Sequence, residues 1–303
     1  MEDHAVSLLE ETLAVNIEQP TFANGNAGIG FALNHIIDNR LIDADYADLF
    51  SARHENIVSA IKNLTYNEND SFDYADYLFF IGSVGESFAD SDMSICQNRL
   101  VSLINKCFDT YESRLDTWQA RNMYYVFSIR LMAVINALQS YRCEYAEHFF
   151  DIILRNAIRL HDDDYICPYP VFYIYLYLTE LHLLDSKYTD TVSRMFEECL
   201  KNIIAETLSF RELIDVVYLL SRIRSLPNNV YDAALSEKVT EVLSKFTDDD
   251  KNKMEYKLKR TLFDTAGYNL GIYGGLCRLL ILDCFWDDMS RGDYPERMTE
   301  LFL

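Results

Sequence analysis

The feature that most constrains this chain is a regular alternation between two kinds of apolar segment. Segments of the first kind carry apolar residues at steps of three and four, which gives a helix one apolar and one polar face. Segments of the second kind are apolar on nearly every side, and such a helix must be buried all round. The two kinds alternate six times along 303 residues. We therefore predict an all-α fold, with an inner layer of buried helices and an outer layer of amphipathic ones.

The predicted helices can be placed from this pattern. The outer helices are expected at Ala5–Val15, Tyr46–Leu64, Ser91–Asp116, Tyr145–Leu160, Val192–Leu208 and Leu235–Phe246. The inner helices are expected at Ile29–Ile37, Tyr77–Val84, Met123–Leu138, Val171–Leu184, Leu213–Leu220 and Leu270–Trp286. Each outer helix with the next inner helix makes one unit of a repeat, with a period near 45 to 50 residues.

Alternating inner and outer helices favour a closed ring, an α/α toroid (barrel) of about six helix pairs. An open α-solenoid is the alternative, but it would leave a polar concave face on the second helix of each pair. Here the second helix is too apolar for such a face. Neither a low-complexity tract nor a Gly/Ser linker divides the chain, so residues 1–303 are expected to form one toroid domain.

Composition excludes several classes of protein. With 10 glycines and 5 prolines the chain has few residues for the tight turns of an all-β fold. A net charge of −21 disfavours binding to nucleic acid or to an anionic membrane surface. The longest apolar run, Val171–Leu178, is far shorter than the roughly 20 residues of a membrane span. The acidic N-terminus shows no secretory signal. We expect a cytoplasmic protein, monomeric or weakly dimeric, whose seven dispersed cysteines are reduced and packed.

Nine of the ten glycines gather in three clusters, two of them at or near the start of a predicted inner helix. The clusters comprise Gly25, Gly28 and Gly30; Gly82 and Gly85; and Gly267, Gly271, Gly274 and Gly275. Because glycine destabilises a helix by about 0.5–1 kcal/mol relative to alanine, something must offset its presence. Close helix packing would do so, and so would backbone amides that face a ligand. A Rossmann or P-loop site is excluded, because no strand precedes a cluster and no Gly-Lys-Ser/Thr follows.

Two of these segments resemble a known family. Gly25-Asn-Ala-Gly-Ile-Gly-Phe-Ala-Leu33, followed by Ile36–Asp43, is similar to the Gly-x-x-Gly-Ile-Gly segment that opens an inner helix in lanthionine synthetase C-like proteins, most of all in the variety found in gut Bacteroidetes. Gly271–Leu280 resembles a late copy of that helix start. The resemblance implies an α/α barrel and, in active members, zinc-assisted addition of a peptide cysteine thiol to a dehydroamino acid.

The zinc site that the resemblance implies does not carry over to this chain. Active members bind zinc with two cysteines and a histidine, one pair lying in a late Cys-His-Gly run. No cysteine here precedes a histidine, and no histidine follows His182. Cys143, His148, His161 and Cys167 could form a site from distant positions. The simpler interpretation of His161 is that it lies at a solvated helix end. The simpler interpretation of His35 is that it is a packed or hydrogen-bonded residue. We expect no metal and no cofactor.

Carboxylates offer a second line of chemistry, because some α/α toroids are glycoside hydrolases or lyases that use two acids about 5–9 Å apart. Asp73 and Asp76 lie three residues apart near the start of a predicted inner helix, and Asp162–Asp164 occupy a comparable place. The alternative interpretation is that acidic residues there favour the helix dipole. The 39 tyrosines and phenylalanines (21 Tyr and 18 Phe) could line a sugar cleft or fill the core. No nucleophile elbow is present.

Two functions of different class therefore stay open. The first is a cyclase-like protein without zinc that binds a precursor or modified peptide, or a small molecule, as an accessory to ribosomal peptide modification. The second is a carbohydrate-active toroid enzyme that uses an acidic pair. In either case a ligand is expected at the mouth where the inner helices begin, and the net charge favours a neutral or cationic one. The candidate ligand-binding residues are Asn24, Asn26, Asp73, Asp76, Trp118, Tyr169, Arg211 and Asn269.

Overall fold

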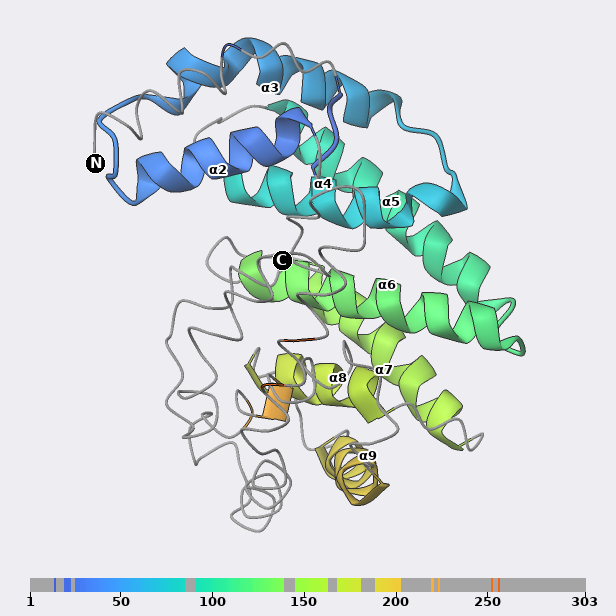
Figure 1. The fold of residues 1–303 in the computed structure, drawn as a ribbon. Helices are drawn as coiled ribbons and strands as arrows, with labels where there is room; N and C mark the ends of the chain where they lie inside the picture. The colour runs from blue at the N-terminus through green and yellow to red at the C-terminus, as the bar shows by residue number, and fades with distance from the viewer. Residues whose placement is uncertain are drawn as a thin grey trace. The chain divides into compact units, whose positions relative to one another are not determined.

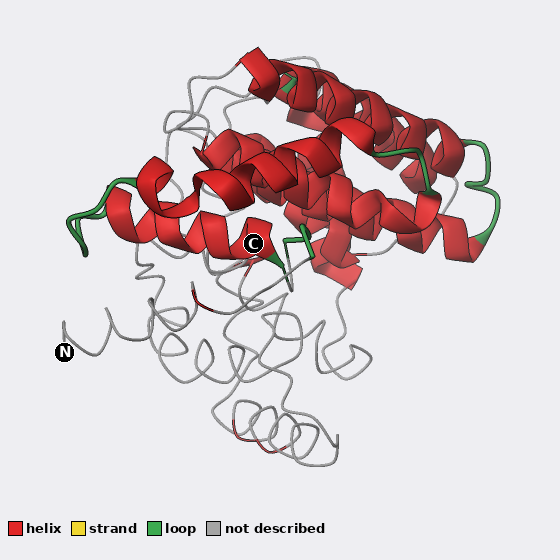
Figure 2. Cartoon of the chain, turned by 90° about the horizontal axis from the view of Figure 1, so that it is seen from above, coloured by secondary structure: helices red, strands yellow, loops and turns green. Residues whose placement is uncertain are grey.

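The computed structural model describes residues 19–22, 25–84, 91–138, 145–162, 168–180 and 189–202, and the single residues 14, 219, 220, 223, 252 and 256. In this part of the chain 85% of the residues are helical and none lies in a strand, which confirms the all-α prediction there (Figure 2). None of the described helices is both long and apolar enough to cross a membrane. The chain divides into two compact units, residues 1–145 and 146–303, and each is described by itself.

The first unit contains five α-helices and one short 3-10 helix among its described residues (Figure 1). In chain order these are α2 (Asn26–Asp38), α3 (Tyr46–Asn63), η1 (Glu68–Asp70), α4 (Ser71–Val84), α5 (Ser91–Glu112) and α6 (Trp118–Ala137). Each of the five α-helices overlaps a helix predicted from periodicity, whereas η1 was not predicted. The amphipathic helices match their predicted bounds to within a few residues, whereas the apolar helices begin three to six residues earlier than predicted, in polar sequence.

Burial separates the helices into the two predicted kinds. In α4, 11 of the 14 residues are buried, including every residue from Tyr74 to Ile81. In α3 only 6 of the 18 residues are buried, and they follow one stripe from Tyr46 to Ile61. The all-round apolar segments are therefore interior helices, and the one-sided segments form an outer layer.

The interior helices of this unit run in the same direction. Between α2 and α4, Asn34 Nδ2 donates a hydrogen bond of 3.1 Å to the carbonyl of Ser83, 49 residues away. Between α4 and α6, the rings of Phe72 and Phe127 lie 6.2 Å apart, and Arg130 bonds to Asp76, 54 residues away. Residue numbers rise together along each pair, so α2, α4 and α6 are parallel, with a repeat close to the predicted period.

The outer helices run against their inner neighbours. The start of α2 meets α3 through a hydrogen bond from Arg53 Nη1 to Asn26 Oδ1 (3.3 Å). The start of α4 meets the end of α5, where the Ser71 and Tyr111 hydroxyls lie 2.9 Å apart. Each outer helix thus returns the chain to the end of the molecule at which the next inner helix begins.

Glycine explains how closely the inner helices pack. A Cβ atom at Gly30 would lie 2.6–2.9 Å from ring or hydroxyl atoms of Phe50, Tyr46 and Phe80, and one at Gly82 would lie 2.6 Å from Leu138. No side chain larger than hydrogen fits without a shift of these neighbours. At these two positions the structure supports the packing explanation for glycine, and the glycines from 267 to 275 lie outside the described residues.

The second unit contains α7 (Ala146–Asp162), α8 (Pro168–Glu180) and α9 (Thr189–Asn202) among its described residues. They continue the alternation, since α7 and α9 are amphipathic whereas the described side chains at the centre of α8, from Val171 to Leu176, are buried. The ring of Phe196 on α9 stacks on Tyr175 of α8, with centroids 4.3 Å apart.

Several predicted helices fall outside the described residues. These are Leu235–Phe246, Leu270–Trp286, Ala5–Val15 apart from Ala14, Leu213–Leu220 apart from Leu219 and Leu220, and the ends of Val171–Leu184 and Val192–Leu208.

Candidate functional site

The start of helix α4 carries the two carboxylates that the sequence singled out, and the structure gives them different surroundings. Asp76 forms an ion pair with Arg130 of α6, in which Oδ1 lies 2.5 Å from Nη2 and 2.7 Å from Nε. The two side chains are only about a tenth exposed, at 11% and 10%. Burial raises the pKa of Asp76, and the guanidinium opposes that effect. Asp76 is therefore engaged within the protein, between two inner helices.

Asp73 lies one turn before Asp76 and has no such partner. It is half-buried, and it makes neither a hydrogen bond nor an ion pair in the part of the chain that the structure describes. Its pKa is raised, first by burial and then by repulsion from Asp76 and Asp70. Among the described residues this partly desolvated carboxylate has no compensating charge, which is unfavourable for stability.

The segment between α3 and α4 fixes the position of this helix start. The hydroxyl of the buried Tyr74 accepts a hydrogen bond from the Asn67 amide (2.8 Å) and lies 3.0 Å from the Thr65 carbonyl. One turn before Asp73, η1 contributes Asp70. The result is that residues 65–70 are tied to the first turn of α4, which bears Asp73.

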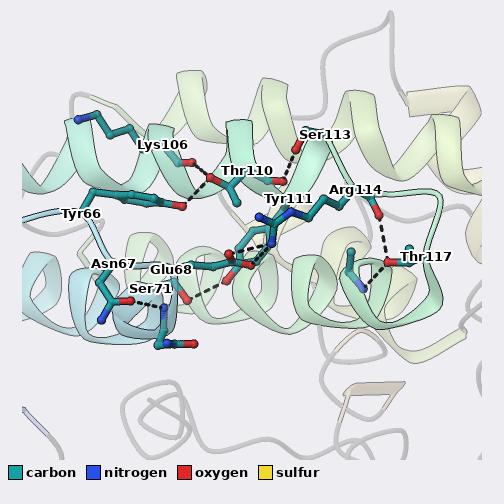
Figure 3. A network of polar contacts seen from close by, with 12 residues as sticks. Tyr66, Asn67, Glu68, Ser71, Lys106, Thr110, Tyr111, Ser113, Arg114 and Thr117 are labelled. Atoms are coloured by element: carbon teal, nitrogen blue, oxygen red, sulfur yellow. Dashed lines mark hydrogen bonds and ion pairs between the residues drawn. The ribbon is translucent and has the colours of Figure 1, made fainter.

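A second set of contacts holds the same segment against the end of α5, as Figure 3 shows. The hydroxyls of Tyr66 and Thr110 lie 2.5 Å apart, and Arg114 Nη1 lies 2.9 Å from Glu68 Oε2. Thr117, the N-cap of α6, accepts a hydrogen bond from the Ala120 amide. These contacts bring the end of α5 and the starts of α4 and α6 to one end of the unit.

Asn26 is the one predicted site residue of α2 that the structure describes. Asn26 is buried, and its side-chain Oδ1 accepts the hydrogen bond from Arg53. Its backbone N–H donates to the Gln19 carbonyl (2.9 Å). The register of α2 on α4 places it near the level of Asp76. These two contacts join the start of α2 to α3 and to the chain before it.

The remaining candidate residues cannot be placed at this site. Trp118 is the first residue of α6 and Tyr169 the second of α8, but their side chains are not among those described. Asn24, Arg211 and Asn269 lie outside the described residues altogether. The structure therefore brings Asp73 and Asp76 together, and it adds Arg130, which sequence reasoning missed. The signal for Arg130 was present, because it is the one charged residue in the apolar segment Met123–Leu138.

Metal ligands and thiols give no second site among the described residues. That part of the chain holds no group of three or more His, Cys, Asp or Glu side chains placed to bind a metal ion. Of the four residues considered for a distant zinc site, only His148 has a described side chain, and its ring lies beside that of Phe149. Cys96, Cys107 and Cys199 are buried and form no disulfide in the described part of the chain, and burial raises the pKa of Cys107 to about 12. At that pKa Cys107 stays a thiol at neutral pH, which makes it a poor nucleophile.

Comparisons with known proteins add no relative. A scan against protein-family models found no match, and searches of curated proteins and of solved structures found no significant match. The function is therefore inferred from the residues themselves.

Proposed function

We propose that this chain is a ring-shaped, lanthionine synthetase C-like protein without the zinc chemistry, and that it binds a peptide or small molecule through Asp73. The ligand would be cationic or neutral, and the protein would act as an accessory in ribosomal peptide modification. The resemblance of Gly25–Leu33 and Gly271–Leu280 supports the family, and the missing Cys-His-Gly run argues against cyclase activity.

The observation that carries the binding proposal is the state of Asp73. Within the described part of the chain this half-buried carboxylate has neither a hydrogen bond nor an ion pair, and two neighbouring acids repel it. Such a group lowers stability unless a partner compensates it. A ligand cation would supply that partner, since charge-assisted hydrogen bonds to carboxylates are among the stronger polar contacts. Such stability costs are common at functional sites.

The packing of the first unit supports the ring. Parallel inner helices, each followed by an antiparallel outer helix, are the local geometry from which an α/α toroid is built. The bonds Asn34–Ser83 and Asp76–Arg130 repeat that geometry twice. In a ring the inner helices begin at one mouth, and Asp73 lies in the first turn of α4, where a ligand at that mouth would reach it.

One observation favours the carbohydrate-active alternative. The raised pKa of Asp73 suits a general acid that must keep its proton. A second carboxylate would have to act as nucleophile or base, however, and Asp76 is already neutralised by Arg130 and buried. We therefore favour binding over hydrolysis.

Calorimetric titration with matched probes tests the proposal. Two hexapeptides, identical except for lysine or glutamate at the same positions, and a neutral hexasaccharide would be titrated into wild type, Asp73→Asn and the control Asp92→Asn. Asp92 is a partly exposed acid of α5 paired with Lys62 (2.5 Å). We expect the lysine peptide to bind wild type and the control alike, and Asp73→Asn about tenfold more weakly, since one charge-assisted contact is worth roughly 1.4 kcal/mol or more.

Two outcomes would contradict this proposal. Equal binding of the lysine peptide by Asp73→Asn and Asp92→Asn would remove Asp73 from the site. Reducing sugar released from the hexasaccharide by wild type, and lost in Asp73→Asn, would establish the carbohydrate-active alternative instead.

A further inference from the structure

Helix α2 presents an apolar face that its described neighbours leave partly open. Gly28, Ile29, Ala32, His35 and Ile36 follow one side of the helix at steps of three and four, and none of them is buried. Ala32 is exposed, and all but one of the five are apolar or glycine. The opposite side is buried against α3 and α4. A helix that is apolar all round needs a cover on this face as well.

The chain that precedes α2 enters on this same face. A Cβ atom at Gly28 would lie 2.1 Å from the Phe22 carbonyl oxygen, so the chain passes directly over that glycine. The backbone N–H of Asn26 donates a hydrogen bond to the Gln19 carbonyl, and the ring of Phe22 lies 5.7 Å from that of Phe31. The chain from Gln19 to Phe22 therefore lies beside the start of α2, on the side of Gly28.

Those preceding residues carry a matching apolar face in their sequence. Ala5–Val15 is predicted to be helical, with Leu9 and Leu13 on its apolar side and Glu10 on its polar side. Ala14 falls on the polar side of that pattern, and the structure has it helical and exposed, as the pattern predicts for this residue. An 11-residue helix is about 16 Å long, comparable with the 13 residues of α2.

We propose that the segment Ala5–Val15 docks on the open face of α2, with Leu9 and Leu13 against Ile29 and Ile36. The segment would give the first inner helix an outer partner of its own, and it would keep an apolar surface from meeting a second copy of the chain. This docking is independent of any ligand at Asp73.

Hydrogen exchange of the full-length protein tests the docking. In Leu9→Asp/Leu13→Asp we expect the amides of α2 to exchange at least about fivefold faster than in wild type, since a lost cover lowers the free energy of local opening. The matched control is Ala14→Asp, which adds the same charge to the polar side and should leave α2 unchanged. Unchanged α2 exchange in the folded double variant would overturn the proposal. Faster α2 exchange in Leu279→Asp instead would also overturn it, because it would identify the C-terminal segment as the cover. Protection of α2 that depends on protein concentration would overturn it too, because it would identify a second copy of the chain as the cover.

Disulfide trapping keeps the proposal testable if the double variant does not fold. Leu9→Cys or Leu13→Cys would be combined with Ile29→Cys or Ile36→Cys, and Ala14→Cys with the same partners would serve as control. Bridges require Cα atoms within about 7 Å of each other. We expect at least one leucine position to cross-link to α2 within the monomer and Ala14→Cys not to. Absence of all four leucine cross-links, or equal cross-linking by Ala14→Cys, would overturn the docking.

Discussion

Asp76 and Arg130 form a buried ion pair that joins two parallel inner helices, with Oδ1 and Nη2 2.5 Å apart. The sequence placed Asp76 among the residues for a ligand, and the structure shows that the protein already uses its charge. An arginine keeps its charge at any accessible pH, so Arg130 depends on Asp76 wherever the pair stays buried.

We expect Asp76→Asn to destabilise the protein by about 3–5 kcal/mol, because it leaves a buried guanidinium without a counter-charge. Asp76→Leu/Arg130→Met should recover most of that loss, since an apolar pair needs no compensation. Urea denaturation of both variants measures the difference, and Asp92→Asn, which breaks a partly exposed pair, should cost less than about 1 kcal/mol. Equal losses of stability in Asp76→Asn and Asp92→Asn would mean that burial does not determine how much an ion pair contributes to stability.

Asp73→Asn should stabilise the protein at pH 7, whereas Asp76→Asn should destabilise it. The folded pKa of Asp73 is raised above the unfolded value of 3.8, so its contribution to stability is full below about pH 3.8 and is lost as pH rises through the folded pKa. Removing the ionised group therefore gains up to about 1 kcal/mol at neutral pH, kept small by water screening of a half-buried carboxyl. Thermal unfolding at pH 7 and near pH 3.5 should show the gain only at the higher pH. A gain of equal size at both pH values would show that the ionisation of Asp73 does not cause the gain.

Alanine substitutions at two glycines should differ in their effect. Gly30→Ala places a Cβ against three aromatic side chains, and we expect a loss of about 1–3 kcal/mol from overpacking. Gly82→Ala meets chiefly the flexible end of Leu138, and alanine regains up to about 1 kcal/mol of helix propensity, so the net change should be near zero. Chemical denaturation of the two variants decides this, and an equal loss at both positions would mean that the Leu138 side chain does not yield to a Cβ at Gly82.

The Tyr74 hydroxyl should matter more than that of Tyr66. Tyr74→Phe leaves the Asn67 amide without its acceptor beside a buried ring, and we expect a loss of about 1–2 kcal/mol. Tyr66→Phe removes only a partly exposed contact with Thr110, which we expect to cost less than about 0.5 kcal/mol. The free energies of unfolding of the two variants provide the measurement. A larger loss for Tyr66→Phe would mean that Tyr74 does not hold the start of α4.

Within the described residues, the sequence by itself determined which segments become helices and which of them are buried. Periodicity alone separated the one-sided α3 and α5 from the apolar cores of α4 and α6, because the burial of a helix follows from the distribution of its apolar residues. It did not predict where the inner helices begin. The first turns of α4 and α6 are polar, and their starts depend on contacts such as Thr117 with Ala120 and Tyr74 with Asn67.

Only the tertiary structure decided what the polar residues of the inner helices do. Asp73 and Asp76 look alike in the sequence, three residues apart in one helix. Their difference comes from Arg130, 54 residues beyond Asp76, which the parallel packing of α4 and α6 brings to one carboxylate and not to the other. The spacing of apolar residues predicts which face of a helix is buried. Pairing between polar side chains depends instead on how two helices align, and that alignment is a property of the tertiary packing.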